Sequence, residues 1–259
     1  LLVLAFFYLP ILYVVVFSFN DSKSLSKFTG FSLQWYEKMF ANRTIMESIY
    51  YTVVIAVIAT VVSTIVGTIA AIGLSKSRRI VKELTLQINN LPMMNPEIVT
   101  AIGLMLLFTS LNIKTGFMTL LLAHIAFCIP YVMLSIMPKL RQMDPNLPEA
   151  ALDLGATPWQ ALTKVIVPEI MPGIVTGAIM AFTMSIDDFV VSYFTAGTTS
   201  QPLSVVIYSM TRHRMTPKIN AISTILFLIV LALLIVINMR QSRDEKRREA
   251  TRRKGAMQP

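Results

Sequence analysis

The sequence predicts an all-helical protein that crosses a membrane about six times. Of its 259 residues, 54% are hydrophobic and 14% are charged, whereas about a quarter of the residues in a soluble domain carry charge. The mean hydropathy of +0.64 points the same way. A helix needs about 20 apolar residues to cross the hydrocarbon layer of a bilayer. We therefore expect one membrane domain with mostly short connections, surrounded by lipid.

Six apolar segments are long enough to be spans. Five of them are clean runs, over 1–19, 51–74, 117–137, 172–194 and 219–239. The sixth, 84–111, is interrupted by asparagines, prolines and Glu97. Such breaks at membrane depth are tolerated only where protein or a water-filled cavity covers them, so this segment should face the interior.

The two ends of the chain carry separate predictions. The run 1–19 is not followed by a small-residue cleavage site, so we interpret it as a span and not as a signal peptide. The chain begins at Leu1 without an initiator methionine, which fits an incomplete N-terminus. We expect a transmembrane domain over 1–239 and a basic cytoplasmic tail over 240–259.

The distribution of charge predicts the orientation. Most of the 23 Lys and Arg residues fall in the two connections that follow the second and fourth spans and in the C-terminal tail. The positive-inside rule then places both termini in the cytoplasm, together with the long loop over 138–171. The net charge of +9 is therefore explained by the membrane orientation, and we do not expect nucleic acid to be a partner.

Several chemistries find no support in the sequence. The chain lacks the G-x-x-x-x-G-K-[ST] pattern of a P-loop, so any ATP must be handled by a partner. Cys128 is the only cysteine, which excludes an intrachain disulfide. His124 stands in an apolar span with no second ligand at helical spacing, so we interpret it as a packing residue. No catalytic site, metal site or cofactor is predicted.

The loop over 138–171 contains two short predicted helices. Asn146 is a suitable N-cap, Pro148 fits a first turn, and Gly155 is a typical residue just past a helix end. A second helix starts after Thr157 and is expected to end at Pro168. An amphipathic hairpin lying on the bilayer surface would have the same features.

The same loop resembles the cytoplasmic signature of ABC importer permeases. That signature reads E-A-A, three residues, G, nine residues, I-x-L-P, and here it is matched by Glu149, Ala150, Ala151, Gly155 and the stretch 165–168. Valines replace two aliphatic positions of the pattern. The resemblance implies a type I (MetI-like) permease fold. It also implies that these residues seat on an ATPase and transmit its closure to the membrane helices.

Resemblance to the polyamine-carrying members of this family extends over nearly the whole chain. The matching stretches are 35–36, 96–99, 127–130, 185–192 and 207–210, besides the loop. It implies a non-enzymatic permease subunit in the inner membrane of a bacterium, importing spermidine or putrescine. The implied partners are ABC ATPase subunits, a second homologous permease and an extracytoplasmic substrate-binding protein.

Three acidic residues stand within predicted spans, where each ionised carboxylate costs about 2.5–3.5 kcal/mol unless it faces a cavity or a partner. They are Glu97, Asp187 and Asp188. With no Lys or Arg inside the membrane to neutralise them, they would attract a cation. The candidate residues of a substrate path are Glu97, Asp187, Asp188, Ser185, Trp35 and Tyr193.

Structural roles compete with this interpretation. Adjacent helical residues point about 100° apart, so one aspartate could instead cap a helix break or pair with a partner subunit. Glu97 could satisfy backbone N–H groups freed at Pro96, Ser185 could bond to its own helix, and Trp35 could anchor an interface. A permease for iron or another small cation, an ATP-independent channel or secondary transporter, and a membrane anchor are the competing functions.

Overall fold

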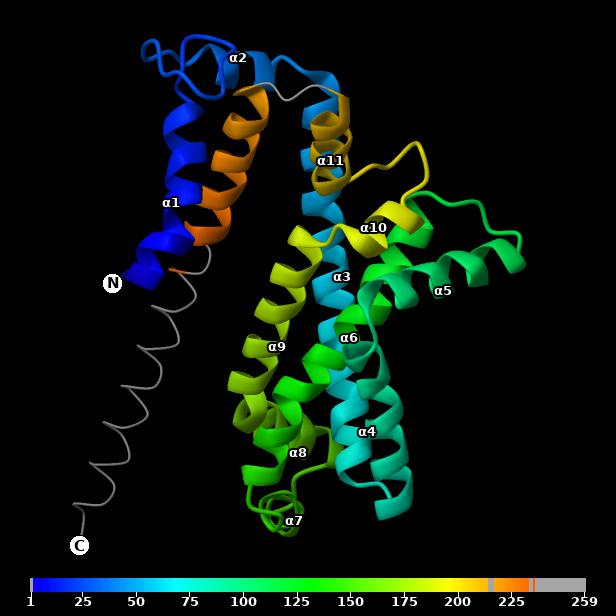
Figure 1. Cartoon of the computed structure of the whole chain (residues 1–259). Coiled ribbons are helices and arrows are strands. Elements are labelled where there is room, and N and C mark those ends of the chain that lie inside the picture. The colour runs from blue at the N-terminus through cyan, green and yellow to red at the C-terminus, as the bar shows by residue number, and fades with distance from the viewer. Residues whose placement is uncertain (1, 214–216, 233–234, 236–259) are drawn as a thin grey trace, which may run out of the picture. The chain divides into compact units, whose positions relative to one another are not determined.

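The computed structural model describes residues 2–213, 217–232 and 235, coloured in Figure 1. The chain divides into two compact units, one made of residues 1–46 and 209–259 and the other of residues 47–208. The tail predicted over 240–259 and the end of the segment predicted over 219–239 lie outside the described residues.

The terminal unit holds α1 (Leu2–Phe17), α2 (Gln34–Phe40) and an apolar helix over Pro217–Ala232. The loop between α1 and α2 is organised by buried Asn20. Its Nδ2 donates to the carbonyl oxygens of Ser24 and Lys27, each at 2.9 Å, and its Oδ1 accepts from the Thr29 N–H at 2.9 Å. This side chain supplies the hydrogen bonds that a loop without regular structure would otherwise lack.

The central unit is a bundle of long and short helices. They are α3 (Arg43–Ser75), α4 (Arg79–Met94), α5 (Glu97–Ser110), α6 (Phe117–Gln142), α7 (Leu147–Asp153), α8 (Pro158–Ala161), α9 (Val167–Asp187), α10 (Val190–Thr195) and α11 (Leu203–His213), of which α3 and α11 continue into the terminal unit. Among the residues that the structure describes, three helical runs are long and apolar enough to cross a membrane, and the bent pair α4–α5 would make a fourth. Shorter apolar helices occupy the first and last predicted segments. The predicted fold class is confirmed.

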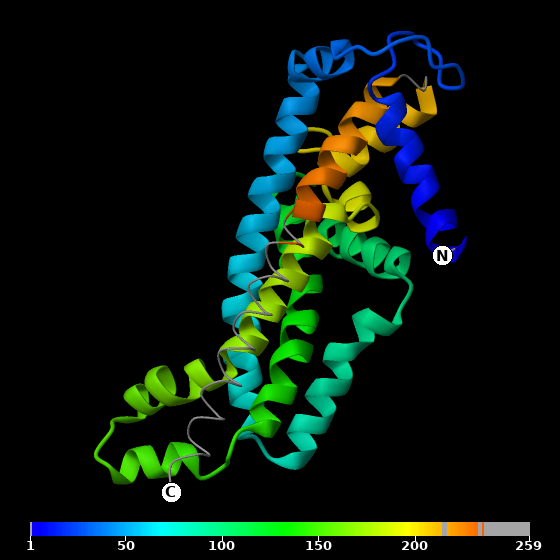
Figure 2. The same cartoon turned by 90° about the vertical axis from the view of Figure 1, so that its left-hand side faces the viewer.

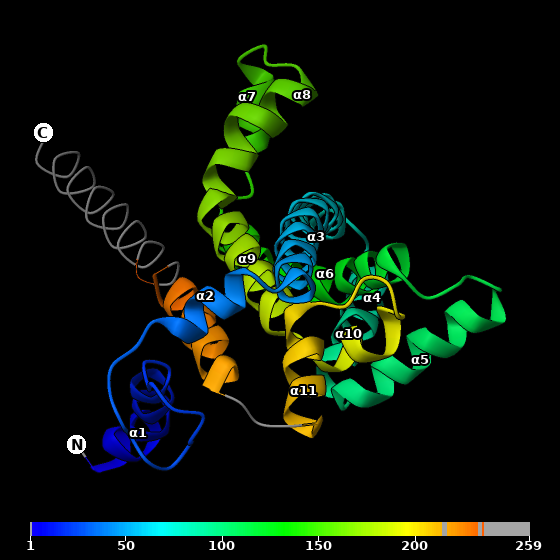
Figure 3. The same cartoon turned by 90° about the horizontal axis from the view of Figure 1, so that it is seen from above.

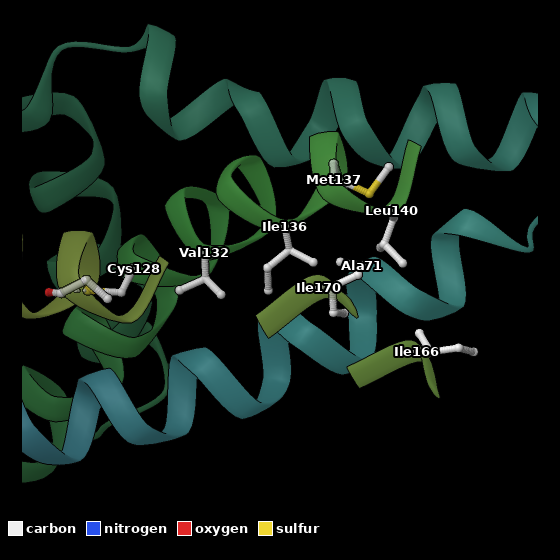
Figure 4. Close-up of a cluster of buried hydrophobic side chains, with 9 residues drawn as sticks. Ala71, Cys128, Val132, Ile136, Met137, Leu140, Ile166 and Ile170 are labelled. Carbon is white, nitrogen blue, oxygen red and sulfur yellow. Dashed lines mark hydrogen bonds between the residues drawn. The ribbon is translucent and has the colours of Figure 1, made fainter. Parts of the chain in front are cut away.

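Helices α3, α6 and α9 form the centre of this unit (Figure 3). Their apolar side chains interlock in a buried cluster, of which Figure 4 labels Ala71, Cys128, Val132, Ile136, Met137, Leu140, Ile166 and Ile170. The Cys128 thiol belongs to this cluster and lies 3.5 Å from the carbonyl oxygen of Ala181. Cys128 is therefore a packing residue on α6.

Glycines on one face of α9 let it approach α6 closely. A Cβ atom on Gly173 would lie 2.9 Å from the carbonyl oxygen of Ser135, and one on Gly177 would lie 3.1 Å from the Cα of Val132. Small residues four apart are a common means of close helix packing in lipid, where no hydrophobic effect drives the helices together. The α6–α9 pair is thus fixed by backbone-to-backbone contact.

Pro96 explains the sharp bend between α4 and α5. Asn95 precedes Pro96 and adopts an extended conformation, as residues before proline prefer to do, and this ends α4 at Met94. Helix α5 then starts at Glu97, at 106° to α4. Figure 2 shows the two helices meeting at this bend. The interruption predicted within 84–111 is therefore a change of direction.

The loop over 138–171 forms the expected pair of short helices at the end of the bundle opposite α10 (Figure 1). However, the expectation that Pro168 ends the second helix is wrong. A continuous helical run extends from Pro158 to Asp187. It passes through a π-helical turn over Leu162–Ile166, and this wider turn precedes the proline, whose missing N–H would break a regular α-helix.

The close α6–α9 contact gives a paired stability prediction. Gly173→Ala is expected to lower the free energy of unfolding by about 1–3 kcal/mol, because the new methyl group meets backbone atoms of α6. The control is Gly103→Ala in α5, where a Cβ atom has open space. It should gain up to about 1 kcal/mol from helix propensity. Thermal unfolding of both variants in detergent checks this, and equal melting temperatures would contradict it.

Candidate functional site

A cavity of about 340 Å³ opens where α4, α5, α6, α9 and α10 meet. Its lining residues are Pro92, Glu97, Thr100, Phe127, Tyr131, Met184, Asp187, Asp188, Phe189, Val190 and Val191. The three carboxylates predicted for the path are all among them. Lysine and arginine are absent from this lining, so the cavity has an acidic wall without a neutralising charge.

Glu97 reaches the cavity because of the bend before α5. It is the first residue of that helix, where the unpaired N–H groups and the helix dipole favour a negative charge. Its side chain is exposed, and no other described residue forms a hydrogen bond or ion pair with its carboxylate. The carboxylate therefore remains available at the cavity wall.

Asp187 is the last residue of α9 and lines the same cavity as Glu97. Its side chain is exposed, and its carboxylate has no hydrogen-bonded partner in another described residue. An ionised carboxylate placed inside an apolar layer without a partner is costly. Asp187 and Glu97 together form an anionic wall that can receive a cationic group.

Asp188 has a different environment, and it corrects the prediction of an unbroken span over 172–194. Helix α9 ends at Asp187, and Asp188 has a non-helical backbone, with φ −59° and ψ 125°. Its carboxylate accepts hydrogen bonds from the N–H groups of Val191, at 3.3 Å, and Ser192, at 2.7 Å. Asp188 therefore caps α10, the structural role that competes with direct cation binding.

Buried His124 on α6 completes the surroundings of Asp188. Its Nδ1 lies 2.7 Å from the Ser185 hydroxyl, and its Nε2 lies 3.1 Å from the Ser192 hydroxyl. The same Nε2 lies 3.5 Å from Oδ2 of Asp188. His124 thus forms a polar network with three partners, so it packs in the interior with its ring nitrogens satisfied.

Three of the predicted path residues do not line this cavity. Ser185 is buried and directs its hydroxyl at His124. Tyr193 is 52% exposed and contacts the tilted ring of Phe189 and the edge-on ring of Tyr208, with ring centroids 5.6 and 5.9 Å away. Trp35 belongs to the terminal unit, where its indole N–H donates to the Asn20 carbonyl oxygen at 2.7 Å.

The sequence analysis did not predict that aromatic residues line the cavity. Phe127 and Tyr131 come from α6, and Phe189 follows the aspartate pair at the break before α10. Aromatic faces attract ammonium groups and pack against alkyl chains. Phe127 and Tyr131 are four residues apart, on the helix that also carries His124. This spacing places them on one helix face and could have indicated that they line one site.

The hairpin α7–α8 carries the residues predicted to contact an ATPase. Glu149 and Ala150 are exposed on α7, and Ala151 is half-buried. Gly155 ends α7 in the left-handed region, at φ +85°. Its N–H donates to the Leu152 carbonyl oxygen at 2.9 Å, and the next N–H reaches the Ala151 carbonyl oxygen at 3.0 Å, which is the Schellman arrangement.

The second half of the hairpin is also capped. The Thr157 hydroxyl accepts from the Gln160 N–H at 3.3 Å, and the Gln160 side chain accepts from the Thr157 N–H at 2.9 Å. Leu154 and Trp159 are 89% and 71% exposed at its tip. Large apolar side chains exposed on a well-capped hairpin are typical of a protein contact surface.

A multi-pass helical protein that keeps carboxylates around a cavity within its apolar layer is built as a membrane permease. Residues 63–248 match the family described as binding-protein-dependent transport system inner membrane component. The chain belongs to this family, and it is a multi-pass component of an inner membrane. The resemblance to ABC importer permeases is confirmed.

Curated relatives cover most of the chain. The spermidine/putrescine transport system permease protein PotC of Haemophilus influenzae is 39% identical over 234 residues, which are 90% of this chain and 91% of the relative. The putrescine transport system permease protein PotI of Escherichia coli is 34% identical, over 87% of this chain and 83% of its own. The fold matches a solved bacterial ABC transporter of alginate import, with a TM-score of 0.74 at 16% identity over 92% of each chain.

The two adjacent aspartates are expected to differ in their effect on stability. Asp188→Ala removes the cap of α10 and should lower the free energy of unfolding by about 1–2 kcal/mol. Asp187→Ala removes a carboxylate without a bonded partner and should change it by less than about 0.5 kcal/mol. Thermal unfolding of the two purified variants tests this, and a larger loss for Asp187→Ala would contradict the assignment.

Proposed function

We propose that this chain is a permease subunit of an ATP-driven ABC importer for polyamines such as spermidine and putrescine. It works with a second homologous permease, with ABC ATPase subunits and with an extracytoplasmic substrate-binding protein. The chain carries out no catalysis of its own. The observation that carries the proposal is the cavity with two unpartnered carboxylates, in a chain whose curated relatives are named as polyamine permeases.

The chemistry of the cavity suits an alkyl chain with ammonium groups. Glu97 and Asp187 can each pair with one ammonium group, while Asp188 adds negative charge at the rim. The aromatic rings of Phe127, Tyr131 and Phe189 can pack along the methylene groups or face a charge. Tyr193, Trp35 and Ser185 stay candidates for later or earlier points on the path. An anionic or neutral cargo would gain nothing from this wall.

Coupling to ATP runs through the long helical run that joins the two sites. The run from Pro158 to Asp187 has 30 residues, or roughly 45 Å at helical rise. Its first turn belongs to the hairpin with Glu149 and Gly155, and its last residue is at the cavity. A displacement of the hairpin by an ATPase therefore has a direct route to the carboxylates.

The orientation follows from the distribution of positive charge. With both termini in the cytoplasm, the hairpin faces the cytoplasmic ATPase, and the cavity lies toward the outer half of the bilayer. Cargo released by the external binding protein would then meet the carboxylates before it passes the α6–α9 pair. The basic residues of the C-terminal tail would attract anionic lipid on the cytoplasmic side.

Neutralising the cavity carboxylates is expected to impair transport. Glu97→Gln and Asp187→Asn should each lower spermidine uptake about tenfold, since each removes one charge-assisted contact worth about 1.4 kcal/mol. Glu83→Gln is the control, because Glu83 pairs with Arg79 on an exposed surface of α4. Uptake into proteoliposomes holding the full transporter is the measurement. Unchanged uptake in both cavity variants would remove the cation path.

Disrupting the hairpin should separate cargo capture from transport. Alanine at both Glu149 and Gly155 is expected to abolish ATP-driven uptake, because it removes a contact group and strains the left-handed turn that ends α7. Capture of spermidine by the external binding protein should be intact. Gly73→Ala in α3, with open space around it, is the control. Normal uptake by the double variant would defeat the coupling proposal.

A further inference from the structure

The hydrogen bonds of His124 join three helices beside the cavity, at the interruption between α9 and α10. Its imidazole is 1% exposed and comes from α6, while Ser185 is near the end of α9 and Ser192 is in α10. None of these three residues lines the cavity, whereas Asp188 does. The network is therefore placed behind the acidic wall and meets it at Asp188.

The partners indicate how the ring is used. An ionised carboxylate only accepts hydrogen bonds. A proton on Nε2 faces the Ser192 hydroxyl and the Asp188 carboxylate, at 3.1 and 3.5 Å, and leaves Nδ1 to accept from the Ser185 hydroxyl at 2.7 Å. Both ring nitrogens of His124 then have a hydrogen-bonded partner, as a buried polar side chain requires.

The network joins the tightly packed pair α6–α9 to the short helix α10. Helices α6 and α9 are fixed to each other through Gly173 and Gly177, so His124 and Ser185 keep their relative positions. Helix α10 has six residues, and its first N–H groups bond to Asp188. The Ser204 hydroxyl also donates to the Asp188 carbonyl oxygen, at 2.7 Å. Asp188 is consequently the joint between the rigid pair and α10.

We propose that His124 is a positioning residue for the cation path, which holds Asp188 on the start of α10 and so leaves Asp187 as the aspartate that meets the cargo. This inference rests on the proposed function and divides the aspartate pair into two tasks. Asp187 contacts the cation. Asp188 and Ser185 act through the shape of the wall.

A mutant cycle in the complete transporter tests this division. His124→Phe keeps a ring of similar size and removes both ring nitrogens, and it should lower spermidine uptake per assembled transporter about tenfold. His124→Gln restores one donor and one acceptor and should recover uptake to within about threefold of the wild type. Adding Asp188→Ala to His124→Phe should produce little further loss, because both changes release the same joint. Adding Asp187→Asn to His124→Phe should lower uptake by the product of the two single-variant factors, because the two residues act independently.

Thr119→Val is the matched control. Thr119 is also buried on α6, and its hydroxyl donates to the Thr195 carbonyl oxygen at the other end of α10, at 2.9 Å. This variant loses a hydrogen bond between the same two helices without touching Asp188. It should reduce thermal stability while uptake per assembled transporter stays within about twofold of the wild type.

The outcomes separate the inference from the function it rests on. Wild-type uptake by His124→Phe, or losses that multiply with Asp188→Ala, would overturn the positioning role. Equal losses in Thr119→Val and His124→Phe would reduce His124 to a general packing residue, which also overturns it. A wild-type transporter that carries no polyamine defeats the proposed function. Melting temperatures of the same cycle then still decide whether His124 acts through Asp188.

Discussion

In a hydrocarbon layer, each backbone N–H or carbonyl group without a partner costs several kcal/mol. This constraint decides where the chain can interrupt its helices. Between α4 and α5 the interruption coincides with Pro96, which has no N–H to satisfy. Between α9 and α10 the carboxylate of Asp188 accepts from the freed N–H groups of α10. Both interruptions border the same cavity. The residues at the two helix interruptions are therefore also the residues that supply its carboxylates.

The sequence could predict most of the apolar helices, the hairpin and the three cavity carboxylates, because these depend on local composition and spacing. Gly155 at a positive φ and the capping box of Thr157 follow from short-range chemistry. The division of labour between Asp187 and Asp188 depends on where α9 ends, which is set by tertiary partners such as His124. The helix continues through Pro168 because a π turn precedes it, and no local sequence pattern predicts that turn.

The central unit places its two candidate sites at opposite ends of one helical run. Rigid packing against α6 keeps this run in register with the helix that carries Phe127, Tyr131 and His124. Motion that alters the hairpin end must either move α6 and α9 together or be absorbed at the wide turn over Leu162–Ile166. Single π turns inside α-helices occur frequently at functional sites, which fits the place of this one between the hairpin and the cavity.

The buried state of Cys128 has a practical consequence for labelling. Its thiol is buried in the α3–α6–α9 cluster, where the surrounding side chains keep labelling reagents away from it. Since the sequence contains a single cysteine, a cysteine engineered on the surface would be the dominant target of a maleimide dye or spin label. Pairs of engineered surface cysteines can thus be labelled for distance measurements by fluorescence or pulsed resonance without first replacing Cys128.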